Sequence, residues 1–488
     1  MSQNQALVDA SMEALSRQFE VKLSLLKEFI PQASHVIFLP STNGREAAEM
    51  TASVLAENES RYHCFFNERG FHNHIVHHAL ASYSLGANAE TIKANFERQA
   101  VYQRPIVGVE NEEINSENWT FHLEDENYYQ KYLKFFSHEI KEKGAIKTVE
   151  EYVFNRKEGN MLSRSFGGLL HPFIHWGYGL EFKIDHIVAE GLAQTAAHSP
   201  FAGLKSFEIE HSKQSIEPPS NGAHQLPHSS RLDWESPSVH KTFKPKKGLT
   251  GFDILSKIAH DPALEFRNGS IENILEALQK SAKNERLAYW IDHWIIDEKA
   301  QWDEIIDRTK EIIWVVTVIY ATSYDKEKDK FILDFVLMHL VTASIFLPVT
   351  LPVLESQFRP KLLKAFFRAV VIAWTAKGAP ELELFKCLSD SALISTTELQ
   401  CAEKEENPWF KVLGSAAKHP DEHTTKIIRT FAFASTFYGT TKQGYYYGEL
   451  KGTDLLDSSI FLRAAIMTLN KMDWERKHGD EGTMKWFD

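Results

Sequence analysis

Residues 71–85, FHNHIVHHALASYSL, carry apolar side chains at a helical spacing. His74 and His78 share one face of that expected helix, four residues apart. This spacing lets two imidazoles reach the same metal ion. A helix face with buried, hydrogen-bonded histidines would give the same pattern. The stretch therefore predicts a helix and leaves two interpretations of its histidines, a metal site and a structural role.

The helical period recurs along most of the chain, whereas the alternating patterns typical of strands are few. Further helices are expected at residues 46–57, 128–143, 185–197, 271–282, 302–322, 331–346, 361–377 and 424–438. Residues 212–248 contain five prolines among serines, histidines and lysines, which predicts a long loop or a linker. We expect a mostly α protein: one large, bundle-like helical domain, or two lobes joined by that linker, with a metal site between core helices.

Composition narrows the functional classes. The chain has 488 residues, 54 basic and 66 acidic, so its net charge is −12 without histidine. A general nucleic-acid binder needs a concentrated basic surface, so we expect no nucleic-acid partner. Three cysteines, far apart and in no CxxC pair, predict neither a disulfide framework nor a thiolate zinc site. A reducing, cytoplasmic location is the expectation.

Two segments bear on membranes and targeting. Residues 1–20 contain three acidic side chains and no uninterrupted apolar run, so no secretory signal is expected. Residues 331–354 are apolar enough to consider as a membrane span, but Pro348 and Pro352 interrupt them. Asp334 and His339 in the same stretch would be costly in lipid. We expect a buried core helix there and no membrane span.

Common nucleotide-binding and hydrolase motifs are absent from the sequence. There is no GxGxxG and no GxxxxGK[ST], the glycine turns that bring a backbone close to the phosphates of NAD, FAD or ATP. No GxSxG nucleophile motif occurs either. An enzyme with this sequence is expected to rely on its histidines and a bound metal, without flavin.

Other histidines fit a metal site as well as they fit a core. In residues 167–179, GGLLHPFIHWGYG, His171 and His175 form a second pair four residues apart, and Pro172 suits the first turn of a helix. His339 lies in the apolar segment 335–343, and His423 begins an amphipathic helix. Taken alone, His339 and His423 are better explained as hydrogen-bonded core residues, whereas the pair in 167–179 fits either role.

Five segments, taken together and in this order, resemble the fungal questin oxidase-like family. They are FHNHIVHHALASYSLGA, GGLLHPFIHWGYGLEF, VAEGLAQTAAH, MHLVTA and DEHTTKIIRT, and the resemblance runs from about Phe71 to about Gly439. It implies oxidative opening of the central ring of an anthraquinone to a benzophenone carboxylic acid, in fungal polyketide metabolism. That activity has been described as Baeyer-Villiger chemistry with a reduced nicotinamide, for which this chain shows no binding motif.

The resemblance also implies a metal site. Matching the family's motifs residue by residue selects His74, His175, His339 and His423 as ligands, with His78 and His171 as second choices or neighbours. Four helices would then each give one ligand, as in metal centres of helical bundles. Iron is the implied metal, because O2 must be activated and imidazole suits iron. An anionic ligand is expected as well, with these candidates: Glu181, Asp185, Asp334, Asp421 and a carbamylated Lys377.

The leading hypothesis is a non-haem Fe(2+) dioxygenase with O2 as co-substrate and an anthraquinone as substrate. Trp176, Tyr178 and Phe182 are candidates for packing the flat substrate. One of His78, His171 and Lys426 is expected to move the phenolic proton. The alternatives are an NADPH-dependent Baeyer-Villiger-type monooxygenase and a metal-free helical binder of hydrophobic aromatics. The sequence does not determine the oligomeric state.

Overall fold

The computed structural model describes residues 28–32, 34, 36–108, 113–156, 158–201, 204, 242–264, 282–395, 407–473 and 486. Most of these residues are helical, and their strands are short, so the predicted mostly α fold is confirmed. The helix expected at 271–282 and most of the loop expected at 212–248 lie outside the described residues. None of the described helices combines the length and apolar character that a membrane crossing requires.

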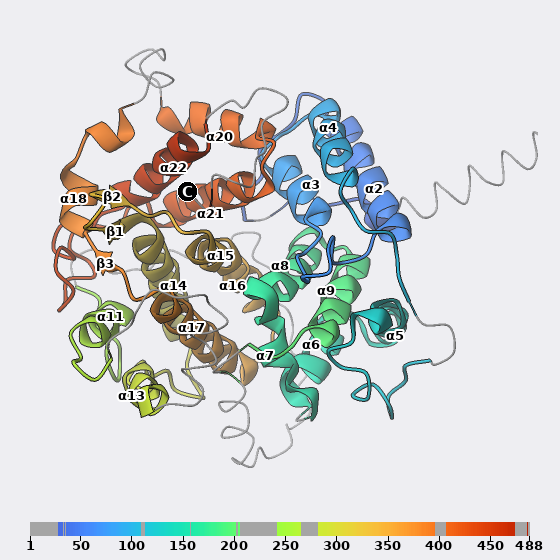
Figure 1. Ribbon diagram of the computed structural model, residues 1–488, viewed down its shortest axis with the longest axis horizontal. Coiled ribbons are helices and arrows are strands. Elements are labelled where there is room, and N and C mark those ends of the chain that lie inside the picture. Colours follow the sequence, from blue (N-terminus) through green and yellow to red (C-terminus); the bar gives the residue numbers. More distant parts are fainter. Residues whose placement is uncertain are drawn as a thin grey trace, which may run out of the picture.

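The first set of helices lies on one side of the molecule, coloured blue to green in Figure 1. These elements are α2 (Gly44–Arg61), α3 (Ile75–Ser84), α4 (Ala89–Ala100), η1 (Glu126–Tyr128), α5 (Tyr129–Lys143), α6 (Ala145–Val149), the π-helix η2 (Glu150–Asn155), η3 (Glu158–Asn160), α7 (Met161–Ser165), α8 (Gly167–Phe182) and α9 (Asp185–Ala197). Two of them start near a predicted boundary, α5 within one residue and α9 at the predicted residue itself.

The second set lies on the other side and contains the described strands. Its helices are α11 (Gly251–Ala259), α13 (Ala282–Ile291), α14 (Trp302–Thr322), α15 (Phe335–Ser344), α16 (Leu347–Thr350), α17 (Phe358–Ala376), α18 (Leu384–Ser389), η4 (Ala392–Ile394), α20 (Pro408–Lys418), α21 (Glu422–Tyr438) and α22 (Ser459–Met472). Strand β1 (Ser323–Asp325) pairs antiparallel with β2 (Lys330–Phe331) and with β3 (Glu381–Leu382). This small sheet connects the end of α14 to the start of α15.

Four helices form a closed ring where the two sets meet. Contacts join α3 to α8, α8 to α15, α15 to α21, and α21 back to α3. Figure 1 shows these four helices near the centre of the molecule. Two of them come from each set, so the middle of the ring is built by segments far apart in the sequence. The helices of this ring carry or directly follow the segments that contain His74, His78, His171, His175, His339 and His423.

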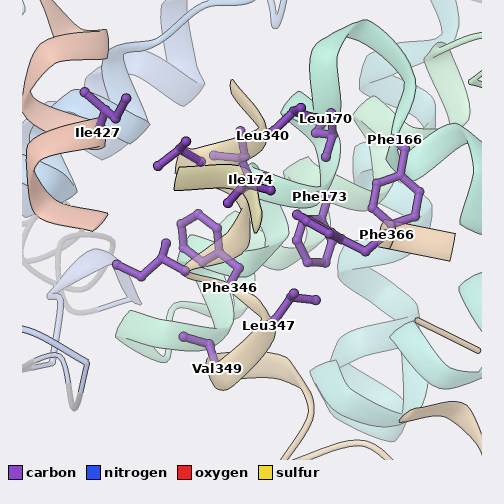
Figure 2. Packing of buried hydrophobic residues seen from close by; sticks show 14 of the residues in the cluster. Phe166, Leu170, Phe173, Ile174, Leu340, Phe346, Leu347, Val349, Phe366 and Ile427 are labelled. Carbon is purple, nitrogen blue, oxygen red and sulfur yellow. The ribbon is translucent and has the colours of Figure 1, made fainter. Parts of the chain in front are cut away.

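An apolar core lies beside the ring. Figure 2 shows side chains of α8 (Phe173, Ile174) gathered with side chains from α15 to α17. On its opposite side α8 packs very closely against α9, because a Cβ at Gly191 would lie 2.5 Å from the backbone nitrogen of Trp176. Each large apolar side chain buried in this way stabilises the fold by about 1.5 to 3 kcal/mol. The packing fixes the face that α8 presents to the ring.

The start of α8 is strained. Gly168, Leu169 and Leu170 have positive φ angles of 51°, 58° and 64°. The left-handed conformation costs an L-residue roughly 1 to 2 kcal/mol, so two consecutive leucines there need strong support from their surroundings. Regular helix follows, with Pro172 in its first turn, where a missing N–H does no harm. The strained turn lies directly before His171.

Candidate metal centre

Four histidines meet inside the helix ring. Ligand nitrogens of His74, His171, His339 and His423 all lie within 4.8 Å of one another. His74 caps the start of α3, and the other three belong to α8, α15 and α21. Each helix of the ring therefore contributes one imidazole. Their exposed fractions are 6%, 5%, 0% and 2%, so the cluster is closed to bulk water.

Two of these imidazoles are held from outside by backbone carbonyls. Nδ1 of His171 donates to the carbonyl of Gly168 at 2.5 Å, and Nδ1 of His339 donates to the carbonyl of Phe335 at 2.8 Å. A carbonyl only accepts, so Nδ1 carries the proton in both rings. Nε2 of each is then an unprotonated acceptor facing the cluster. Metal-binding histidines are ordinarily oriented in this way.

The carboxylate of Glu422 lies close to two further rings. Its Oε1 lies 3.4 Å from Nδ1 of His74 and 3.3 Å from Nδ1 of His423. The carboxylate is 5% exposed, and burial raises its pKa. Nε2 of His74 then points inward and lies 2.8 Å from Nε2 of His171. Because Nε2 of His171 is an acceptor, this contact requires either a proton on Nε2 of His74 or a cation shared by the two nitrogens.

Several buried nitrogens at the cluster lack a partner. Among the described residues, Nε2 of His339, both ring nitrogens of His423 and Nζ of Lys426 are buried without a hydrogen bond. Buried polar atoms without partners are uncommon and need an explanation, such as an ion. Burial also lowers the pKa values of His74 and His171 well below the usual range, so both are neutral, as ligation requires. The donor set fits a metal that prefers imidazole.

Comparison with known proteins places the chain in a family. The family described as Questin oxidase-like matches residues 71–431, well over half of the chain. This chain belongs to the questin oxidase-like family. All four clustered histidines lie within the matched region.

Named relatives of the chain cover most of its length. Oxidoreductase AflY of Aspergillus parasiticus is 25% identical, over 89% of this chain and 82% of the relative. Baeyer-Villiger monooxygenase dmxR6 of a Cryptosporiopsis species is 26% identical, over 82% of this chain and 84% of the relative. Questin oxidase of Aspergillus terreus is 25% identical, over 78% of this chain and 79% of the relative. The names of all three relatives are those of oxidoreductases.

His175, which the family resemblance assigned as a ligand, lies outside the cluster, and His171 takes its place. Nε2 of His175 donates to Oε2 of Glu190 at 2.7 Å, and Nδ1 accepts from the Gln194 amide at 3.0 Å. A step of four residues moves a side chain about 6 Å along a helix and turns it about 40°. This step places the His175 side chain away from the centre of the helix ring and against Glu190 and Gln194 of α9.

His78 is also separated from the cluster. Helix α3 begins only at Ile75, so His74 precedes the regular helix and does not share a helical face with His78. His78 donates from Nε2 to the His419 carbonyl at 3.1 Å and accepts at Nδ1 from Gln99 at 2.6 Å. Burial lowers the pKa of His78 to about 3. A neutral, fully hydrogen-bonded imidazole is poorly suited to the expected proton transfer.

Lys377 does not reach the cluster through any described contact. It caps α17, is 29% exposed, and places Nζ 2.8 Å from Oδ2 of Asp334. Asp334 in turn caps α15, accepting from the backbone of Val336 at 2.8 Å. The buried lysine beside the histidines is Lys426, which is 2% exposed and whose pKa burial lowers to about 8. The described contacts therefore place Lys426, and not Lys377, beside the histidines.

The other carboxylates expected as ligands differ in whether they lie near the clustered histidines. Glu181 pairs with Arg429 and accepts from Ser34, whereas Asp185 is exposed. Asp421 is the candidate that the structure places beside a clustered histidine, in a group with Glu422 and His423. It caps α21 by accepting from the backbone of Thr424 at 2.7 Å. Its second oxygen, Oδ2, is buried without a hydrogen bond.

The aromatic residues expected to pack the substrate belong to the core. Trp176 is fully buried and lies edge-on to Phe173, with a ring separation of 4.8 Å. Phe182 is fully buried as well and lies under the Arg429 guanidinium. The ring of Tyr178 stacks on the ring of His77, with 5.3 Å between their centroids, and His77 itself is not one of the four clustered histidines. Trp176 and Phe182 therefore have a structural explanation that needs no ligand.

Sequence reasoning missed three features of the site. Glu422 lies inside the DEH motif but was not among the expected carboxylates. His72 stacks on His171 at 4.3 Å and its Nε2 lies 2.5 Å from that of His198, the last residue of the VAEGLAQTAAH segment. Trp486 donates from Nε1 to Oδ1 of Asp421 at 3.2 Å. The first two had a signal in the quoted motifs, whereas nothing in the local sequence marks Trp486.

Proposed function

We propose that this protein is a non-haem iron oxygenase that opens the central ring of an anthraquinone, with O2 as co-substrate. The observation that carries the proposal is the convergence of ring nitrogens from four buried histidines, His74, His171, His339 and His423, within 4.8 Å of one another. The relatives' names support the reaction class and the substrate class. Imidazole also suits zinc, so iron is proposed from the need to activate O2.

The protein's own residues would keep the site ready for the metal. The carbonyls of Gly168 and Phe335 and the carboxylate of Glu422 fix ring orientation and tautomer. Burial excludes water and keeps the imidazoles neutral. Bound Fe(2+) would supply the electrons that let O2 react with a closed-shell aromatic ring.

An anionic ligand from Lys426 completes the proposal. Addition of CO2 to the neutral amine forms a C–N bond, releases one proton and leaves a carbamate with two oxygens. The amine is buried, has no hydrogen-bond partner in the described residues, and has a pKa close to neutrality. These properties favour carbamylation of Lys426 over Lys377, whose ammonium is paired with Asp334.

The second candidate is a Baeyer-Villiger-type monooxygenase that uses NADPH. The observation that favours it is the name of several relatives, including dmxR6 and ptaJ. In that reaction one oxygen atom of the product comes from O2 and the second comes from water, and NADPH is oxidised. In the dioxygenase reaction the hydroquinone form of the substrate takes up both atoms of O2.

Oxygen-18 labelling separates the two candidates. Protein loaded anaerobically with Fe(2+) is mixed with a hydroxylated anthrahydroquinone and 18O2, without NADPH, and the product is examined by mass spectrometry. We expect a benzophenone carboxylic acid with both new oxygens labelled, and no product from the His171→Ala variant. Product formed only from the quinone with NADPH, carrying one label, would support the monooxygenase. Binding without product under either condition would indicate a non-catalytic binder of aromatics.

A further inference from the structure

The four clustered histidines are closed off from any bulky molecule. None of them is more than 6% exposed. A flat ring system that has to approach the cluster must therefore replace a group that now covers it. The covering group should itself be apolar and flat, and should contact the histidines from outside the ring of helices.

Trp486 has these properties. Its indole is 3% exposed and lies 6.3 Å from the His423 ring and 6.2 Å from the Phe335 ring, centroid to centroid. The indole N–H donates to Oδ1 of Asp421 at 3.2 Å. Trp486 belongs to none of the four helices of the ring, and its contacts to them are side-chain contacts.

The surroundings of the indole form a slot with a definite chemistry, which we call the indole slot. Phe335 is its aromatic wall and contacts the rings of His339 and His423 at 4.7 and 4.9 Å. The ammonium of Lys471 lies 6.0 Å from the indole centroid, within reach of a cation–π contact. Oδ2 of Asp421 is buried without a hydrogen bond and lies 3.8 Å from Nδ1 of His423.

A phenolic aromatic ring matches every one of these contacts. Its face would pack on Phe335 and interact with the Lys471 ammonium, as the indole does. Its hydroxyl would donate to Asp421 in place of the indole N–H. A second hydroxyl could donate to Oδ2 of Asp421, which makes no hydrogen bond among the described residues.

We infer that the indole slot, lined by Phe335, Asp421 and Lys471, binds one ring of a phenolic polycyclic substrate, and that Trp486 occupies this slot until the substrate displaces it. The inference rests on the proposed function for the identity of the substrate. The tryptophan and the substrate compete for one position, so the tryptophan weakens the apparent affinity for substrate. In exchange it keeps water away from the clustered histidines.

The test uses the full chain without metal, so that binding is measured apart from catalysis. Protein labelled with 5-fluorotryptophan is titrated with a dihydroxyanthraquinone, and the fluorine resonance of Trp486 is identified by its absence in Trp486→Phe. We expect that resonance to move to a solvent-exposed position as ligand binds. We also expect Trp486→Ala to bind the ligand about three- to tenfold more tightly than the wild type. Trp302→Ala, which removes a partly exposed indole at the start of α14, should bind as the wild type does.

Two results would overturn the inference. An unchanged Trp486 resonance at saturating ligand would show that the indole stays in place. Weaker binding by a folded Trp486→Ala variant would make the indole part of the substrate site and not its competitor. If no variant binds the anthraquinone at all, the substrate class of the proposed function fails, which is distinct from binding that leaves Trp486 undisturbed.

Discussion

The Nε2 atoms of His74 and His171 lie 2.8 Å apart, although 97 positions separate the two residues in the chain. The outer nitrogens of these rings face the Glu422 carboxylate and the Gly168 carbonyl. The inner nitrogen of His171 is therefore an acceptor, and the contact requires either a proton on Nε2 of His74 or a shared cation. The proposed metal ion would bind both inner nitrogens.

Removing His171 should abolish metal binding, whereas removing His175 should not. His171→Ala deletes an inward-facing nitrogen of the cluster. His175→Asn leaves the cluster intact and keeps a side chain that can hydrogen-bond to Glu190. We expect about one iron per chain in His175→Asn and a large loss in His171→Ala, measured by inductively coupled plasma mass spectrometry after anaerobic loading. Loss of iron in His175→Asn alone would restore the ligand set implied by the resemblance.

Glu422→Gln should weaken metal binding without unfolding the protein. The glutamate oxygen lies 3.4 Å from Nδ1 of His74 and 3.3 Å from Nδ1 of His423, and loss of a partner that orients a metal ligand typically lowers metal affinity about 10- to 100-fold. Glu190→Gln is the matched control, because Glu190 is also buried and accepts a hydrogen bond from a histidine, His175, that lies outside the cluster. Competition with a chromophoric chelator gives both affinities. Equal affinities in the two variants would argue against an orienting role for Glu422.

Carbamylation should depend on Lys426 and not on Lys377. Protein equilibrated with 13C-bicarbonate is expected to show a carbamate carbon resonance in the wild type and in Lys377→Met. The resonance should be missing in Lys426→Met, because that variant lacks the buried amine without a partner. Loss of the signal in Lys377→Met would instead place the modification at the end of α17. A wild-type spectrum without the resonance would remove the carbamate from the proposed ligand set.

Lys310 should make stability depend on pH in the alkaline range. Burial lowers its pKa from 10.5 to about 8, although Asp307 acts in the opposite direction, and the rings of Tyr438 and Tyr445 cover the amine. Between these two pH values the unfolded chain binds more protons than the folded one, so the free energy of unfolding rises with pH. Below pH 8 the full cost of burying the charge is present.

Lys310→Met lacks this titration. The difference in unfolding free energy, wild type minus variant, should therefore increase between pH 7.5 and pH 10 in urea denaturation experiments. The same substitution at Lys93, which is exposed on α4, should leave the difference constant. A constant difference for Lys310→Met as well would mean that its amine titrates normally in the folded protein.

The sequence predicted secondary structure well where the local pattern decides it. The bounds of α9 and α14 are the predicted ones, because amphipathic spacing and the neighbouring polar residues define these helices. The start of α3 was predicted too early. Backbone pairing of Phe65 with His72 keeps residues 71–74 out of the helix, and such long-range pairing leaves no mark on a local period.

The sequence predicted most of the histidines in the cluster but not which histidine of α8 belongs to it. His74, His339 and His423 were expected in the cluster, and the structure groups them. The choice between His171 and His175 depends on the rotation of α8, which follows from the left-handed turn before His171 and from the packing of Gly191 on Trp176. Such tertiary packing cannot be read from the spacing of two histidines. The same limit applies to Lys377 and Lys426, since burial decides between them.

The helix ring takes α3 and α8 from the first part of the chain and α15 and α21 from the second. During synthesis on the ribosome His74 and His171 emerge long before His423, so a nascent chain has only part of the donor set. On the proposed function, full metal loading would be a late maturation step that requires both parts to have docked. The bound ion would add a cross-link to the packing and to the Arg429–Glu181 ion pair that already join these segments, and iron supply would set how much of the newly made protein reaches that locked state.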